Sequence, residues 1–196
     1  MEIKLTRSRQ TADWGSRAGL AKVIPSSVAV GSGTGSADSL GTVTFTSVSS
    51  VSLNNVFSSN YQNYRVVINF TPSTIGTLGF RFRANGTDNT NGTPSGYYWA
   101  GAYLYQSGSV TSNSSNYNNI GRVARYDTGT GFTNFDVMDP YTYGSAKSTA
   151  GFSTGGGADW ESLFNYYADG NYSFDGFSLI PSAGTITGKI RVYGYN

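Results

Sequence analysis

Short segments in which apolar and polar residues alternate, separated by turn dipeptides, most constrain how this chain can fold. Alternation with a period of two is typical of a strand that is buried on one face. The dipeptides Asn85-Gly86, Asn91-Gly92 and Asp169-Gly170 supply the positive φ angles that tight turns require. The sequence predicts strands at residues 42–46, 51–53, 64–70, 78–84, 97–105, 120–126, 132–138, 172–179 and 186–195.

Residues 159–168 are the exception to this pattern. Apolar and aromatic residues recur there at helical spacing, and Asp159 is a suitable N-cap, so one short helix is predicted. About nine or ten strands, with no room for crossover helices between them, favour an all-β fold. The expected architecture is an antiparallel β-sandwich, jelly-roll-like, with an extended N-terminal arm.

The 196 residues include no cysteine and no histidine, which excludes much of enzyme chemistry. A Ser-His-Asp triad, a His-ligated zinc and an imidazole base are impossible without histidine. A thiolate nucleophile and a disulfide framework are impossible without cysteine. We therefore expect no catalytic residues, no metal and no cofactor.

Carboxylates offer the remaining route to catalysis, because a glycosidase needs two of them across a sugar. The tight pairs in the sequence are Asp136 with Asp139, and Asp159 with Glu161. Structural roles are favoured for all four, in an alternating strand, before a proline, or at a helix cap. A carbohydrate-active enzyme using Asp136 or Asp159 is the minor alternative. Residues 88–92 faintly resemble a calcium loop, but a polar hairpin tip is the preferred interpretation.

The two ends of the chain differ in composition. Residues 1–24 carry five basic and two acidic side chains, and a Gly/Ser-rich stretch follows. These features predict an attachment arm at residues 1–29, a flexible linker at 30–40 and a sandwich body at 41–196. A frayed terminus is the alternative, but it would leave an indole in water. The predicted partner-binding residues of the arm are Leu5, Arg7, Arg9, Trp14, Arg17 and Leu20.

Aromatic residues are abundant while charged residues make up only 12% of the chain. Fifteen tyrosines exceed what one core can absorb, because each hydroxyl needs a partner or water. Exposed tyrosine together with asparagine, serine and glycine is typical of contact surfaces against protein or sugar. The predicted contact surface comprises Tyr97, Trp99, Tyr103, Tyr141 and Tyr143; a subunit interface is an equally good interpretation.

Four segments carry a resemblance to a known class of proteins. They are KVIPSSVAVGSGTGS at 22–36, GTVTFTSVSSVSLNNVF at 41–57, YQNYRVVI at 61–68 and GTITGKIRVYGY at 184–195. In style and order they resemble small virion proteins of tailed bacteriophages, most clearly toward both ends and less across residues 95–165. The resemblance transfers no catalytic motif.

The resemblance implies a fibre, tail-tip component or capsid decoration that is trimeric and attaches through its N-terminal arm. A tail fibre or tail appendage that contacts the host is expected first, and a capsid cement or head-fibre protein is the alternative. The implied partners are other virion proteins, copies of itself and a host-surface glycan. The net charge of +2 gives no reason to expect nucleic acid, and neither a signal peptide nor a membrane-spanning run is expected. The protein would thus be made in the host cytoplasm and reside in the virion.

Overall fold

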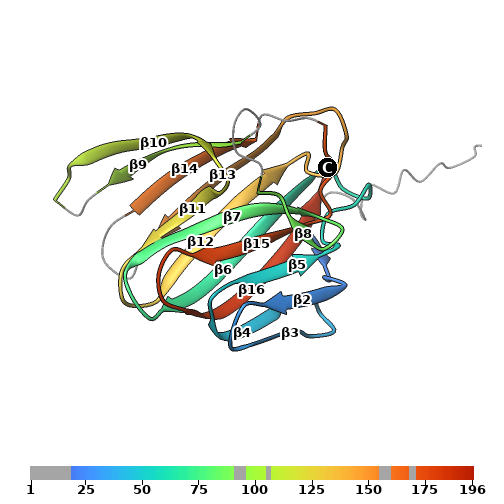
Figure 1. The fold of residues 1–196 in the computed structure, drawn as a ribbon, viewed down its shortest axis with the longest axis horizontal. Coiled ribbons are helices and arrows are strands. Elements are labelled where there is room, and N and C mark those ends of the chain that lie inside the picture. Colours follow the sequence, from blue (N-terminus) through green and yellow to red (C-terminus); the bar gives the residue numbers. More distant parts are fainter. Residues whose placement is uncertain (1–18, 91–95, 105–106, 155–159, 168–170) are drawn as a thin grey trace, which may run out of the picture.

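All regular structure in the computed structural model is β-strand, throughout the residues that it describes: 19–90, 96–104, 107–154, 160–167 and 171–196 (Figure 1). The all-β prediction is therefore confirmed for this part of the chain. Every strand pairing is antiparallel. The sixteen strands are β1 (Ala21–Val23), β2 (Ser27–Val30), β3 (Thr34–Ala37), β4 (Val43–Val48), β5 (Val51–Asn54), β6 (Asn63–Pro72), β7 (Gly76–Ala84), β8 (Thr87–Asp88), β9 (Tyr97–Leu104), β10 (Val110–Asn118), β11 (Gly121–Tyr126), β12 (Gly131–Met138), β13 (Lys147–Thr154), β14 (Trp160–Tyr167), β15 (Gly176–Pro181) and β16 (Ile186–Tyr195).

The strands form two sheets that pack face to face as a sandwich, as the sequence predicted. The larger sheet has the order β10-β9-β14-β13-β12-β6-β16-β4-β3, and β1 also pairs with β16. The smaller sheet has the order β11-β7-β15-β5-β2, with β8 paired to β7. Because the larger sheet is wider, its β9 and β10 project beyond the smaller sheet at one side of the molecule (Figure 1).

The core lies between the facing sides of the two sheets. Strands β6, β12 and β16 alternate buried and exposed residues, which places one side of each against the core. Phe80 of the smaller sheet contacts both layers. Its ring lies 5.6 Å from that of Phe135 in the larger sheet, and 5.7 Å from that of Phe177 in its own sheet. The buried side chains form one continuous cluster. Aromatic residues thus supply much of the contact between the sheets.

One predicted turn is confirmed and two lie outside the described residues. Asn85 and Gly86 have φ angles of 51° and 77°, as a two-residue turn between β7 and β8 requires. Asn91-Gly92 and Asp169-Gly170 fall among the residues that are not described. β15 approaches β5 closely at Gly176, because a Cβ atom there would lie 2.2 Å from the carbonyl oxygen of Leu53.

The flexible linker predicted at residues 30–40 is wrong. Val30 ends β2, which pairs with β5 in the smaller sheet, and residues 34–37 form β3, which pairs with β4 in the larger one. A Cβ atom on Gly33 would lie 2.1 Å from the carbonyl oxygen of Thr46, and one on Gly35 would lie 2.7 Å from the side chain of Val30. These glycines permit close packing of a strand pair that passes from one sheet to the other.

The boundary of the predicted arm is also wrong. β1 pairs with Val192–Gly194 of β16, and β2 belongs to the smaller sheet, so residues 21–29 are part of the sandwich. The body therefore begins about twenty residues before the predicted position. Residues 1–18, which include most of the predicted arm contacts, lie outside the described residues.

The helix predicted at residues 159–168 is wrong where the structure describes it, because residues 160–167 form β14. This strand lies inside the larger sheet and pairs along its length with β13 and with β9. Its sequence places large residues at both odd and even positions. A strand of this kind lacks the clean period of two, so its apolar spacing resembles that of a helix.

Candidate functional site

Asp136 and Asp139 bind different partners in the structure. Asp136 faces outward from the larger sheet and makes a two-pronged ion pair with Arg65: Nε donates to Oδ1 at 2.8 Å, and Nη2 to Oδ2 at 2.7 Å. This hydrogen-bonded carboxylate raises the pKa of Arg65. Oδ2 of Asp139 instead accepts a hydrogen bond from Ser145 at 2.6 Å. Asp159 and the side chain of Glu161 lie outside the described part of the structure.

Ser145 and Lys147 form a second cluster that superficially resembles a nucleophile with its base. Lys147 is fully buried, and burial lowers its pKa, although the charge of Asp139 acts in the opposite direction. Its Nζ donates to the carbonyl oxygens of Thr142 and Ser145 and to Oγ of Ser145. An amine that donates to three acceptors holds the loop between β12 and β13 and has no lone pair directed at the hydroxyl. We assign this cluster a structural role.

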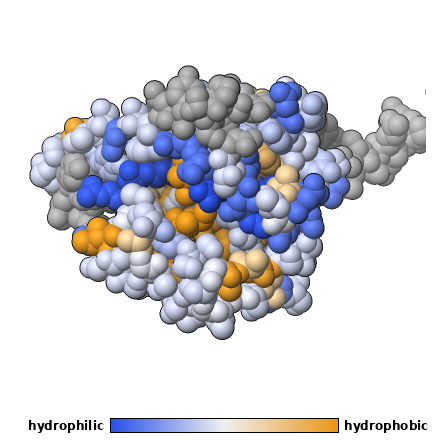
Figure 2. Space-filling model, in the orientation of Figure 1, coloured by the Kyte–Doolittle hydropathy of each residue, from blue (hydrophilic) through white to orange (hydrophobic). Residues whose placement is uncertain are grey.

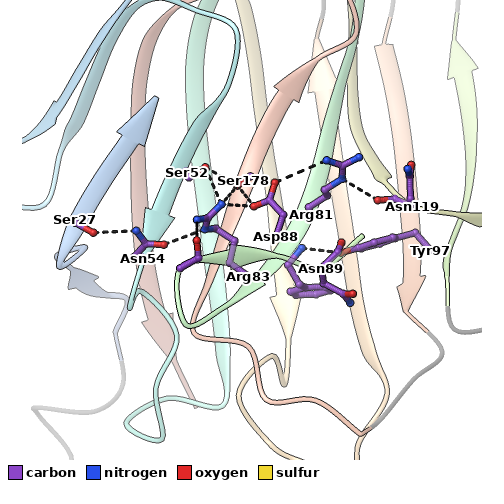
Figure 3. Close-up of polar contacts among 12 residues, drawn as sticks. Ser27, Ser52, Asn54, Arg81, Arg83, Asp88, Asn89, Tyr97, Asn119 and Ser178 are labelled. Carbon is purple, nitrogen blue, oxygen red and sulfur yellow. Dashed lines mark hydrogen bonds and ion pairs between the residues drawn. The ribbon is translucent and has the colours of Figure 1, made fainter. Parts of the chain in front are cut away.

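A polar network centred on Arg83 covers the outer face of the smaller sheet (Figure 3). Its guanidinium binds the carboxylate of Asp88 and donates to Ser178 at 2.9 Å, Ser52 at 3.1 Å and Asn54 at 3.0 Å. Asp88 in turn accepts from Ser178 at 2.6 Å. The four strands β5, β7, β8 and β15 are thereby tied together. The hairpin tip predicted at residues 88–92 is not at Asp88, because Asp88 lies in β8 opposite Arg83, and residues 91 and 92 lie outside the described residues.

Within the described residues, no group of three acidic side chains lies close enough together to hold a metal ion. Nor does any described segment form a helix long and apolar enough to cross a bilayer.

A hollow of about 320 Å³ combines apolar and polar lining residues. It lies at the β11 edge of the smaller sheet, where the β9–β10 hairpin of the larger sheet forms the opposite wall. Hydrophobic surface alternates with hydrophilic surface across the face of the molecule shown in Figure 2. The lining residues are Thr77, Gly79, Trp99, Ser115, Asn118, Ile120, Gly121, Arg122, Ile180 and Ser182.

Trp99 of β9 and Arg122 of β11 meet where the two walls of the hollow join. The guanidinium carbon of Arg122 lies 5.1 Å from the ring centroid of Trp99 and 5.3 Å from that of Tyr103. Arg125 lies 5.6 Å from the ring of Tyr103, on the same row. Cation–π contacts of this kind fix the orientation of both the rings and the cations. The row therefore presents a rigid aromatic and cationic edge.

Asn165 holds β11 in place beside the hollow. Its Oδ1 accepts from the backbone N–H of Arg122 at 2.7 Å, and its Nδ2 donates to the backbone carbonyl of Arg122 at 2.5 Å and to Oγ1 of Thr149 at 2.8 Å. The side chain is only 3% exposed. The register of β11 against β7 shifts between Arg122 and Ala124, so Asn165 replaces a strand neighbour where the ladder is interrupted.

A second bulge shapes the facing wall. The register of β10 against β9 shifts between Ser115 and Asn118, and Nδ2 of Asn118 donates to Oγ of Ser115 at 2.6 Å. The turn that follows is held by Arg81, whose Nε donates to the carbonyl oxygen of Asn119 at 2.9 Å. Bulges are common beside functional sites because they redirect side chains. Here both bulged strands contribute residues to the same hollow.

The predicted aromatic contact surface is correct only in part. Tyr97 and Tyr103 are 1% and 5% exposed, so the expectation that they face solvent is wrong. They lie on the same side of β9 as Trp99, which is half-buried and lines the hollow. Tyr141 and Tyr143 are exposed, and whether they make contacts stays a prediction. Alternation along β9 indicates that its two sides have different surroundings, but the sequence does not say which side faces outward.

The predicted arm contacts are mostly not described: Leu5, Arg7, Arg9, Trp14 and Arg17 fall within residues 1–18. Leu20 lies just before β1 and is 49% exposed.

Sequence reasoning missed Asn118, Arg122 and Asn165, because nothing in their local sequence shows that three separate strands bring them together. No protein-family model, curated protein or solved structure matches the chain.

Proposed function

We propose that this protein is a structural component of a tailed-bacteriophage virion, a tail fibre or tail appendage whose sandwich contacts the host surface. The sequence segments described above supply the relationship. The observation that carries the contact role is the hollow between β11 and the β9–β10 hairpin, whose walls combine an indole, a guanidinium, an amide and hydroxyl groups. Few convergent polar groups around an apolar surface are typical of ligand sites.

Binding is favoured over catalysis because no carboxylate is among the described residues that line the hollow. Arg122 is the one ionisable residue among them. Hydrolysis of a glycosidic bond needs two carboxyl groups placed on either side of the bond. The proposal therefore predicts that Asp136→Asn and Glu161→Gln leave the biological role intact. Release of reducing sugar from host polysaccharide, lost in either variant, would instead support an enzyme.

Capsid decoration is the second candidate, and the outer face of the larger sheet favours it. At one end of this face, strands β9 and β13 place the uncharged residues Tyr98, Ala100, Ala150 and Phe152, and Phe152 is 38% exposed. The Arg65–Asp136 ion pair borders this patch, since Asp136 lies opposite Ala150. An uncharged patch with a charged border suits packing against a shell, because charged residues are depleted in the centre of interfaces.

The decisive experiment is to count the copies of the chain in purified virions by quantitative mass spectrometry and to locate them by immunogold microscopy. Labelled tails with tens of copies or fewer would support the tail role, and hundreds of copies on the head would support decoration. Absence from purified virions would refute both. Purified protein is also expected to compete with phage for adsorption to host cells if the tail role is correct.

Attachment and assembly provide further tests. We expect deletion of residues 1–18 to preserve cooperative unfolding and to prevent incorporation into particles, because β1 and all later strands are retained. Replacing Trp14 by Ala is expected to weaken attachment by a few kcal/mol, the usual range for an interface hot spot. The proposed trimer predicts the corresponding mass in sedimentation, since closed symmetry is usual in such assemblies. A monodisperse monomer at micromolar concentration would contradict it.

A further inference from the structure

We propose that the hollow beside Trp99 binds a neutral saccharide, with one or two pyranose rings seated between β11 and the β9–β10 hairpin. The indole of Trp99 would contact the C–H face of a ring, while Asn118, Ser115 and Arg122 would bind its hydroxyl groups. The inference deepens the proposed host contact and rests on it only for the biological source of the sugar. Binding itself is a property of the purified chain.

The size of the hollow limits the class of ligand. About 320 Å³ lies at the lower end of the range for small-molecule sites, roughly 300–1,000 Å³. This volume suits one or two sugar rings and is too small for a folded peptide segment. The hollow is also open to solvent on one side, so a ring at the end or in the middle of a longer polysaccharide can enter it.

The chemistry of the walls matches a ligand that is apolar on one face and bears hydroxyl groups at its rim. Trp99, Ile120 and Ile180 provide the apolar surface, and the amide of Asn118 and the hydroxyl of Ser182 provide hydrogen-bonding groups. An amphipathic ring such as indole is well suited to a partner with both characters. A pyranose has these two characters.

Charge favours a neutral saccharide over a nucleic acid. A phosphodiester chain is bound through a series of cationic side chains that follow its backbone. Among the lining residues that the structure describes, Arg122 is the one cationic side chain, and its guanidinium is placed over two aromatic rings. The N–H groups of a guanidinium can donate to the hydroxyl oxygens of a neutral sugar, so no charged ligand is required.

The site is built before any ligand arrives, which favours binding. Asn165 fixes the backbone of Arg122 with two hydrogen bonds, and Asn118 is hydrogen-bonded to Ser115 across the β10 bulge. Little side-chain ordering is then required when a ligand binds, so less free energy is lost to conformational entropy.

The test uses the full chain and a panel of neutral oligosaccharides, with binding measured by saturation-transfer NMR and then by calorimetry. We expect at least one member of the panel to bind, and Trp99→Ala to weaken its affinity about tenfold or more, as for a central aromatic anchor. Asn118→Ala, which removes an amide from the same β9–β10 wall, is expected to weaken the affinity by about threefold to tenfold. Leu40→Ala, which truncates an apolar side chain that is 64% exposed and does not line the hollow, is the matched control and should bind normally.

Circular dichroism melting of each variant separates loss of the site from loss of the fold, and Asn118→Ala keeps the test decisive if Trp99→Ala unfolds. Three results would overturn the inference: no neutral saccharide binds, both hollow variants bind as well as the unaltered chain, or a single-stranded oligonucleotide binds there instead. If the protein blocks phage adsorption and both hollow variants block it equally, the inference fails while host contact stands. If sugar binds but the chain is absent from virions, the proposed function fails and the inference stands.

Discussion

Asn165 tests most directly how the edge strand β11 is held against the larger sheet. Replacing it with Leu keeps a similar volume but removes three hydrogen bonds, two to the backbone of Arg122 and one to Thr149. Each lost bond that involves a buried or half-buried polar group costs about 1 kcal/mol or somewhat more. The free energy of unfolding should therefore fall by about 3–4 kcal/mol. With a urea m-value of about 2 kcal/mol/M, the unfolding midpoint should fall by about 1.5–2 M.

The matched control is Thr149→Val, which removes a single acceptor and keeps the shape of the side chain. It should lower the free energy of unfolding by about 1 kcal/mol. Hydrogen exchange provides a local readout, because the amide of Arg122 should lose protection in the Asn165→Leu variant while amides of β16 keep theirs. A midpoint within about 0.3 M of the unaltered protein, given the precision of such extrapolations, would show that Asn165 does not hold β11.

Three further predictions concern alkaline pH, the outer ion pair and a close strand contact. Burial raises the pKa of Tyr97, so the stability that its neutral hydroxyl contributes is complete below about pH 10 and is lost above it, at about 1.4 kcal/mol for each pH unit. In urea unfolding between pH 8 and 12, stability should decline less steeply in Tyr97→Phe than in the unaltered chain, and equal slopes would contradict this prediction. Asp136→Asn should lower the free energy of unfolding by less than about 1 kcal/mol in urea titrations, because its ion pair is partly exposed. Gly176→Ala should lower it by about 1–3 kcal/mol, because the new Cβ atom would lie against the carbonyl oxygen of Leu53; a melting temperature unchanged in Gly176→Ala would contradict the observed packing.

Strands with one buried face were predictable, while strands with unusual surroundings were not. The alternation in 186–195 predicted β16 at its observed bounds, because one side of that strand faces the core and the other faces solvent. β10, which is polar along almost its whole length, has no apolar period and was not predicted. β14 has large residues at both odd and even positions and was taken for a helix. Glycine and serine in residues 30–40 suggested flexibility, although the same residues also permit the close packing of β3.

The candidate site was less predictable than the fold. Trp99 was identified as a contact residue because it is a large aromatic side chain in a chain poor in charge. Its neighbours Tyr97 and Tyr103 were placed on the same surface, and the structure buries both. The side of β9 that faces the smaller sheet depends on where β11 packs, and no local pattern encodes that position.

By itself, the sequence determined the fold class and the limits of the chemistry. Local backbone preferences and the period of two depend on neighbouring residues, so they can be read along the chain, and the absence of histidine and cysteine needs no structure at all. The tertiary structure alone decided which strands meet and which polar groups converge. Asn165, Arg122 and Asn118 come from β14, β11 and β10. They share one site because two sheets of unequal width pack together, which leaves the β9–β10 hairpin to form a wall over the edge of the smaller sheet.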